Sequence, residues 1–131
     1  MAEMTTQDII KKSDEVKESG MDWKDVYKAV YGTVMMNTHR VLRSGNTLAW
    51  LELLPNDAVR VDTFNADTPK NYIKNLREFA KALDKAGFKS AILETPSPKI
   101  IEVVKGLGYP VKVEANKNKT GATIYRGTIN V

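Results

Sequence analysis

Two residue types that build many metal and redox sites are scarce in this chain. Cysteine is absent, and His39 is the one histidine in 131 residues. Without thiols there is no disulfide framework and no thiolate nucleophile. A single histidine does not complete a zinc site of the usual His/Cys kind. The sequence therefore predicts neither a metal centre nor thiol chemistry.

Long apolar runs are lacking as well. No run approaches the roughly 20 residues that a membrane-spanning helix requires. The apolar fraction of 42% and the charged fraction of 27% match an ordinary soluble domain. The opening MAEMTTQDII has neither the apolar centre of a secretory signal nor an arginine-rich transit character. We expect a single cytoplasmic domain over residues 1–131, with no membrane partner.

The first part of the chain is expected to be helical. A Thr5 cap with Asp8 three residues later begins a helix that Gly20 ends. Its apolar stripe is thin, which predicts a peripheral helix within residues 1–20. Asp22 caps a second helix, in which apolar residues recur every three or four positions and predict a buried face. These residues are Trp23, Val26, Tyr27, Val30, Tyr31, Val34 and Met35.

Three strand-like runs follow, over residues 39–43, 47–54 and 58–64. The first two are separated by Ser44-Gly45-Asn46, a composition typical of a tight hairpin turn. A further polar turn separates the second run from the third. The middle of the chain is therefore predicted to be an antiparallel meander.

In the remainder of the chain, helix-like and strand-like segments alternate. Thr68 and Ser97 each precede a proline and are expected to cap a helix with their hydroxyl groups. Between these helices, residues 89–94 are expected to form a buried strand. Strand, helix and strand in succession imply a right-handed crossover, which places strand 89–94 parallel to strand 58–64. With a hairpin at the end, the sequence predicts an α/β fold with one mixed sheet and helices on both faces.

The segment LETPSPKIIEVVKGLGYPV resembles the fourth motif region of the GCN5-related N-acetyltransferase family. In that region a strand ends in a polar turn, and a short helix follows that ends in Leu-Gly-Phe or Leu-Gly-Tyr. Here Ser97-Pro98 and Leu107-Gly108-Tyr109 stand in those places. The order of expected elements is similar to the family over nearly the whole chain, although the family's first strand has no counterpart. The resemblance implies a fold that binds acetyl-CoA.

Two departures from the family pattern bear on chemistry. The family holds the coenzyme pyrophosphate with a glycine-containing loop at the start of its long helix, whereas the stretch from Asp67 to Tyr72 has no glycine. Pro69 removes one N–H donor, and Asp67 brings negative charge to the place of a phosphate. Many members also carry a tyrosine that protonates the departing thiolate, and Val104 stands at that position.

Acetyl transfer to an amine requires a base, and Glu52, Asp62, Glu94 and His39 are the candidates. Glu94 is the best placed, because it ends the predicted parallel strand and ligands of such sheets bind beyond the strand ends. The alternative is an ordinary solvated or ion-paired carboxylate. If acetyl-CoA is bound, the residues implied to line its site are Lys70, Asn71 and Ser97.

The most regular charge feature lies on the helix that Pro69 begins. Four basic residues at spacings of four, three and four fall within a roughly 60° arc opposite the apolar face. They are Lys70, Lys74, Arg77 and Lys81. Such a stripe is compatible with phosphates or an acidic protein partner, and also with a plain solvated helix face. Nucleic acid is the weaker partner, because the net charge is only +4 and no nucleic-acid-binding motif accompanies the stripe.

Two functions remain open at this stage. One is a domain that kept the acetyltransferase fold, lost the coenzyme and serves as a binding or assembly module with a protein partner. It resembles short acetyltransferase-like proteins of tailed phages, some of them virion components, which would place it in a virion. The other is an acetyl-CoA-dependent N-acetyltransferase with an atypical pyrophosphate loop. The missing glycines and the missing phenol favour the first function.

Overall fold

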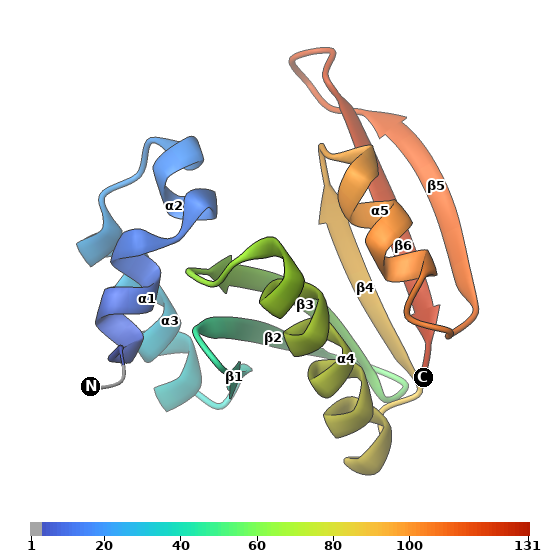
Figure 1. The fold of residues 1–131 in the computed structure, drawn as a ribbon, viewed down its shortest axis with the longest axis horizontal. Coiled ribbons are helices and arrows are strands. Elements are labelled where there is room, and N and C mark those ends of the chain that lie inside the picture. The colour runs from blue at the N-terminus through green and yellow to red at the C-terminus, as the bar shows by residue number, and fades with distance from the viewer. Residues whose placement is uncertain (1–3) are drawn as a thin grey trace.

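The computed structural model describes residues 4–131 and contains one six-stranded mixed sheet. Its strands are β1 (His39–Ser44), β2 (Thr47–Leu54), β3 (Ala58–Asn65), β4 (Ser90–Thr95), β5 (Val111–Lys117) and β6 (Thr123–Asn130). They lie in the order β1-β2-β3-β4-β6-β5. The β3–β4 pair is parallel, and the other neighbours are antiparallel. The predicted meander, crossover and closing hairpin are confirmed (Figure 1).

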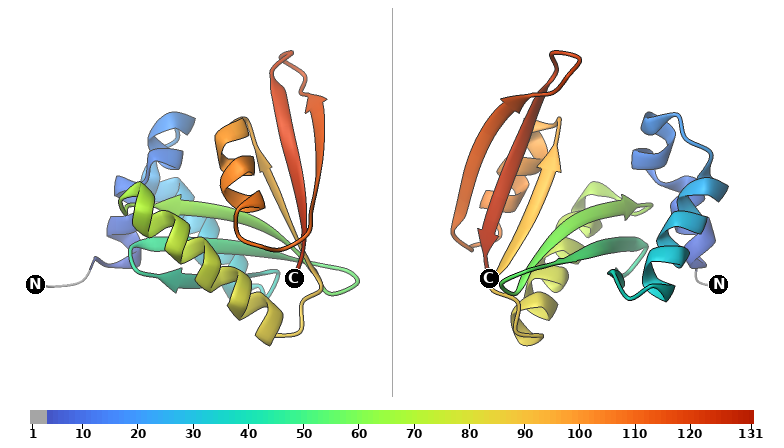
Figure 2. Two further views of the ribbon diagram at one scale, coloured as in Figure 1. Left: turned by 45° about the vertical axis from the view of Figure 1, so that its right-hand side comes forward. Right: turned by 180° about the vertical axis from the view of Figure 1, so that it is seen from behind.

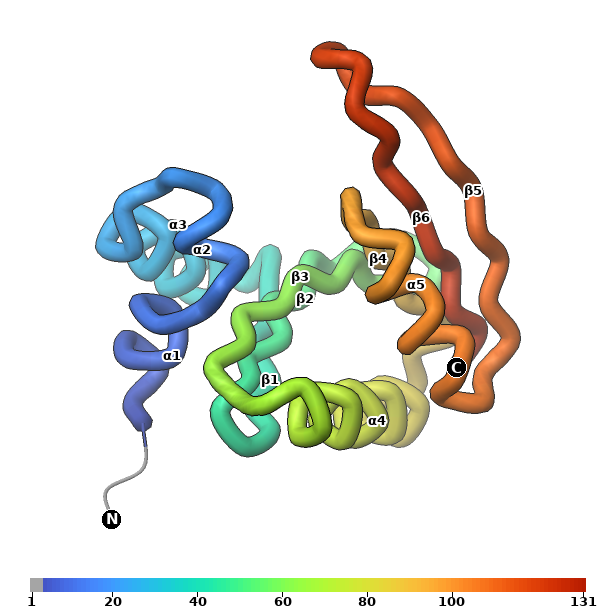
Figure 3. Tube along the Cα trace, turned by 45° about the horizontal axis from the view of Figure 1, so that its top comes forward, coloured from blue at the N-terminus to red at the C-terminus, as the bar shows by residue number. Residues whose placement is uncertain are grey.

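Helices cover both faces of the sheet, also as predicted (Figures 2 and 3). The helices are α1 (Thr6–Lys12), α2 (Asp14–Ser19), α3 (Trp23–Met35), α4 (Pro69–Lys85) and α5 (Pro98–Lys105). On β2, Leu48 packs with Ile9 and Ile10 of α1, Val16 of α2 and Val26 of α3. Its neighbour Ala49 packs with Phe79 of α4. Successive residues of a strand point to opposite faces, so β2 separates two apolar layers.

The N-terminal segment differs from the single peripheral helix that we expected. It forms two helices, because Ser13 is extended (φ −66°, ψ 141°) and ends α1. The Ser13 hydroxyl donates to the carbonyl of Ile10 at 2.9 Å and accepts the N–H of Val16 at 3.4 Å. The segment is not peripheral, since Ile9 and Ile10 are 0% exposed. The thin apolar stripe of this segment is therefore buried in the structure, in which the helix is broken at Ser13.

The buried face expected for α3 is also narrower than its apolar pattern. Val26 and Val30 are buried, but Tyr31, Val34 and Met35 are exposed. The seven apolar residues of α3, at spacings of three and four, cover a wider arc of the helix than the part that faces neighbouring elements. Tyr31 stacks on Tyr27, with 6.4 Å between the ring centroids. The outer side of α3 is thus apolar and open.

The two helix starts with a hydroxyl residue before proline behave differently. Thr68 caps α4 as expected, accepting the N–H of Asn71 at 3.3 Å. The cap expected at Ser97 is wrong, because its side chain makes no capping bond to α5. The N–H of Ser97 instead donates to Oγ1 of Thr95 at 3.1 Å. The helix α5 therefore begins at a proline without a side-chain cap.

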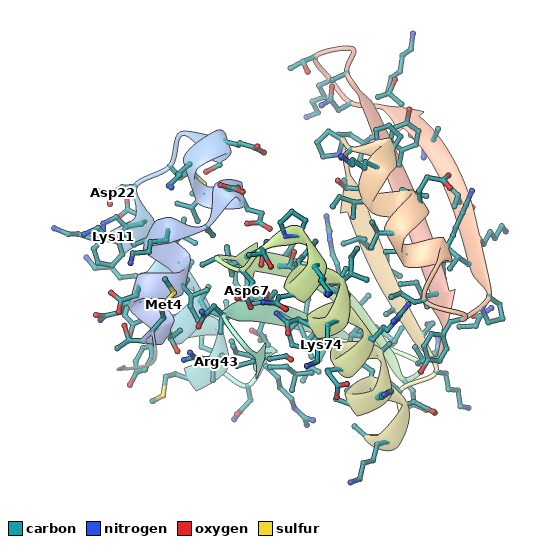
Figure 4. The ribbon with its side chains drawn as sticks, viewed as in Figure 1. Met4, Lys11, Asp22, Arg43, Asp67 and Lys74 are labelled. Atoms are coloured by element: carbon teal, nitrogen blue, oxygen red, sulfur yellow. The ribbon has the colours of Figure 1, made fainter. Side chains whose placement is uncertain are left out.

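A polar network ties the β1–β2 turn to the start of α4. Oδ2 of Asp67 accepts the N–H of Asn46 and the side-chain amide of Asn75, both at 2.8 Å. Asn75 is buried and also donates to Oγ1 of Thr47 at 2.9 Å. Gly45 completes the turn with φ +55°, and a Cβ there would lie 2.7 Å from Oδ2 of Asp67. The place of Asp67 beside α4 can be followed in Figure 4.

We expect Gly45→Ala to weaken this network and destabilise the fold. Alanine costs about 1–2 kcal/mol in the left-handed region, and its Cβ would also displace the Asp67 carboxylate. Gly121→Ala is the matched control, because Gly121 has φ +84° with nothing within 4 Å of its Cβ position. Denaturant unfolding should show a larger loss for Gly45→Ala. Equal losses in the two variants would show that the close approach to Asp67 contributes nothing.

Candidate functional site

The parallel strands β3 and β4 pair over a short length and then separate. Ala58 to Arg60 pair with Ser90 to Ile92, although β3 continues to Asn65. Figure 1 shows the two strands meeting at one end of the sheet and separating towards the other. Peptide groups alternate in direction along a strand, so those of residues 61, 63 and 65 face the opening. We call this region the β3–β4 divergence.

A small apolar cavity lies on the α4 side of the divergence. Val61 and Thr63 of β3, Tyr72 and Leu76 of α4 and Val104 of α5 are among the residues that line it. Its volume is about 50 Å³, against roughly 300–1,000 Å³ for typical ligand pockets. A ligand that entered here would have to displace side chains.

A carboxylate from α2 reaches the far end of the divergence. Oε2 of Glu15 accepts the N–H of Asn65 at 3.0 Å, and its Oε1 lies 3.4 Å from the hydroxyl of Thr63. The Tyr72 phenol is 2.9 Å from the same hydroxyl. Burial raises the pKa of the Glu15 carboxyl, against the lowering effect of the Asn65 N–H. Burial likewise raises the pKa of the Tyr72 phenol, which therefore stays protonated near neutral pH.

The four candidate bases gather on the face opposite α4. Arg60 of β3 forms an ion pair with Glu94 of β4, 3.3 Å apart, across the divergence. His39 lies 3.9 Å from Glu52, its partner in the β1–β2 register. The carboxylate of Asp62 lies beyond Arg60 on the same strand. The structure thus brings together the groups that the sequence proposed separately.

Asp62 differs from Glu94 in its electrostatic setting. The surrounding protein partly desolvates the Asp62 carboxylate and raises its pKa. Arg60 opposes this effect, while the negative charges of Glu52 and Glu94 reinforce it. The residue is nevertheless open to solvent on one side. A reachable carboxylate whose pKa lies closer to neutrality is a better proton acceptor than one held in an ion pair.

Most of the backbone donors expected to hold a pyrophosphate are already used within residues 65–71. The amide of Asn65 donates to Glu15, that of Ala66 to the carbonyl of Asn46, and that of Asp67 to Oδ1 of Asn65. The amide of Asn71 donates to Thr68, and Pro69 has none. The amides of Thr68 and Lys70 remain for a ligand. Asp67 itself turns towards the β1–β2 turn.

The basic stripe of α4 lies on the exposed side of that helix. Its four residues, Lys70, Lys74, Arg77 and Lys81, are all exposed. Lys81 is 3.6 Å from Glu78, one turn earlier on the helix. Figure 4 shows Lys74 on α4. Lys70 is the member next to the free amides, whereas Ser97 lies before α5 and uses its N–H locally.

Sequence reasoning missed Glu15, Thr63 and Tyr72. No sequence signal links Glu15 to a strand about 50 positions later, because the contact depends on the break at Ser13. A tyrosine in the first turns of a helix that follows a strand is the one signal that could have suggested a hydroxyl near the strand end.

Known protein families and curated proteins give no match to this chain at the sequence level. Solved structures do match in fold. An acetyltransferase of Bacillus subtilis in complex with CoA has a TM-score of 0.62 at 10% identity, covering 99% of this chain and 95% of that one. A ribosomal-protein-alanine N-acetyltransferase of Escherichia coli has a TM-score of 0.60 at 13% identity, covering 98% and 90%. The chain has a GCN5-related N-acetyltransferase-like fold.

A third structure extends the comparison. An IAA acetyltransferase of Bacillus cereus has a TM-score of 0.59 at 9% identity, covering 97% of this chain and 93% of its own. The resemblance read from the segment around Ser97 is therefore confirmed for the fold. Among the described residues, no helix has the length and apolar character to cross a membrane, and no group of three or more acidic or histidine side chains is arranged to hold a metal ion.

The raised pKa of Glu15 predicts a specific dependence of stability on pH. The folded protein holds the Glu15 proton more tightly than the unfolded chain does. Its stabilising contribution is therefore complete below the unfolded pKa of about 4.5 and is lost as the pH rises through the folded pKa. Glu15→Gln does not titrate, so its free energy of unfolding should rise relative to wild type as the pH increases above about 4.5.

Denaturant unfolding across pH 4 to 8 measures this difference. Glu18→Gln is the control, because Glu18 lies on the same helix and is exposed. We expect Glu18→Gln to follow the wild-type pH dependence. Parallel curves for wild type and Glu15→Gln would contradict the prediction.

Proposed function

We propose that this domain binds an acyl-CoA at the β3–β4 divergence and transfers the acyl group to an amine. The observation that carries the proposal is the separation of β3 from β4 beyond Arg60, which exposes strand peptide groups between two helix-covered layers. The Bacillus subtilis acetyltransferase of the same fold is a complex with CoA. The acceptor would approach from the face that holds Asp62 and Glu94.

The reaction needs one base on the acceptor side. A bond forms between the amine nitrogen and the thioester carbonyl carbon, the carbon–sulfur bond breaks, and one proton leaves the nitrogen. The thioester supplies the activated acyl group. Asp62 accepts the proton, because its pKa is raised and it is open to solvent. The departing sulfur takes its proton from water, since Val104 occupies the position of the family's phenol.

Glu94 acts through Arg60 in this proposal. Their ion pair spans the divergence at 3.3 Å. It neutralises Glu94, which with Glu52 is one of the two negative charges next to Asp62. Truncating either partner would leave the other charge beside the base. Glu94 is therefore a positioning residue, and Asp62 replaces it as our candidate for the base.

Phosphate binding would rest on Lys70. Its side chain and the amides of Thr68 and Lys70 are the groups left near the start of α4, where the helix dipole favours an anion. Asn71 uses its N–H in the Thr68 cap. We expect weaker coenzyme binding than a glycine-rich loop would give.

A second candidate function is a non-catalytic module that binds a protein partner. It is favoured by the exposed apolar side chains on and after α3, namely Tyr31, Val34, Met35 and Met36. Exposed apolar clusters of this kind often mark protein contacts. The loss of phosphate-binding amides is equally compatible with this function.

Coenzyme binding separates the two candidates. A ligand at about 100 times its dissociation constant stabilises the folded state by about 2.7 kcal/mol. We expect acetyl-CoA to produce such an increase in the free energy of unfolding, measured by denaturant titration. Lys70→Ala should reduce the increase, whereas Lys85→Ala at the other end of α4 should not. No stabilisation by acetyl-CoA or CoA would favour the module.

Acyl transfer should depend on Asp62. We expect Asp62→Asn to lower kcat by about 100-fold, the size of a lost general base, with little change in the KM for acetyl-CoA. The low-pH limb of the wild-type rate profile should disappear. Release of CoA thiol with a panel of primary amines measures the rate. Asp84→Asn, at an exposed position on α4, is the control, and an equal loss in both variants would remove Asp62 as the base.

A further inference from the structure

At the end of its free edge, β3 donates a backbone hydrogen bond to a carboxylate of the same chain. The N–H of Asn65 donates to Oε2 of Glu15 at 3.0 Å, and this N–H faces the divergence rather than β2. The Thr63 hydroxyl lies 3.4 Å from Oε1 of Glu15. The Tyr72 phenol forms a hydrogen bond with the Thr63 hydroxyl at 2.9 Å. The Asn65 N–H and the Thr63 hydroxyl thus converge on the Glu15 carboxylate, and the Tyr72 phenol bonds the same hydroxyl.

The same donors lie where an extended ligand would pair with β3. The arm of coenzyme A contains two secondary amides, and such a chain can add to a free strand edge as a peptide does. Its two carbonyl oxygens would then accept two of the N–H groups that residues 61, 63 and 65 of β3 present to the divergence. Glu15 already takes the last of these. This step rests on the proposed function.

We propose that Glu15 is an internal competitor, an autoinhibitory carboxylate that must leave Asn65 and Thr63 before a coenzyme arm can lie along β3. The contact also places a negative charge beside Asn65, at the end of β3 that leads to α4. A phosphate-bearing ligand is therefore opposed twice, by an occupied donor and by like charge.

The surroundings of Glu15 allow it to withdraw. The helix α2 has six residues, and Val16 is its buried one. Gly20, with φ +72°, ends the helix and has nothing within 4 Å of its Cβ position. Glu15 is itself half-buried, and its carboxylate is incompletely compensated, because burial outweighs the Asn65 bond in setting its pKa. A side-chain rotation would carry it to water.

Glu15→Ala tests the competition directly. We expect it to bind CoA about tenfold more tightly than wild type in isothermal titration calorimetry, and Glu15→Gln to lie between the two. Glu18→Ala removes the same charge from an exposed position of the same helix and should bind as wild type does. Circular dichroism and thermal unfolding establish that each variant is folded. Equal affinities in Glu15→Ala and Glu18→Ala would overturn the proposal.

A second probe separates this inference from the proposed function. Pantetheine carries the two amides without the nucleotide phosphates, so it reports on β3 alone. In NMR titrations with pantetheine, the Asn65 amide should shift more in Glu15→Ala than in Glu18→Ala. If this holds while no variant transfers acetyl groups, the competition stands and the acyltransferase function falls. If neither pantetheine nor CoA distinguishes the variants, the competition falls, whatever the activity.

Discussion

Beyond Arg60 the strand β3 stays paired with β2 but no longer pairs with β4, so its N–H and C=O groups on that side must find other partners. Much of the structure around the divergence follows from this constraint. Glu15 reaches in from α2 to satisfy Asn65, and Tyr72 reaches in from α4 towards Thr63. The N-terminal helices are consequently part of the core and cover an edge that would otherwise be open.

Holding the hairpin at Gly45 and binding a phosphate would use the same few residues between β3 and α4 in different ways. Asp67 holds the β1–β2 turn through Asn46 and Asn75, which requires the chain between β3 and α4 to turn inward. That turn engages the amides of Ala66 and Asp67 in local bonds. A glycine-containing loop leaves such amides free for an anion. The bonds that hold the hairpin therefore leave fewer backbone N–H groups to donate to a phosphate.

The fold could be predicted from the sequence where local pattern decides it. The strand over residues 47–54 and the Thr68 cap of α4 depend on neighbours in sequence, and both are confirmed. The open side of α3 could not be predicted, because it depends on what packs against the helix, and the break at Ser13 rests on local bonds of one serine hydroxyl that the apolar pattern does not reveal. Periodicity identifies an apolar face but gives no measure of how much of it finds a partner, as Tyr31 and Met35 show.

The sequence indicated the carboxylates of the candidate site, but neither the Arg60–Glu94 ion pair nor the contacts of Glu15. Strand register explains why. Arg60 and Ile92 are paired in β3 and β4, so Glu94, two residues further, lies on the same face as Arg60 and forms an ion pair with it. Asp62 lies on that face too, but past the last paired residues, where the strands have separated. The same register that compensates Glu94 leaves Asp62 beside the divergence with a raised pKa, and this placement is why we propose Asp62 rather than Glu94 as the base.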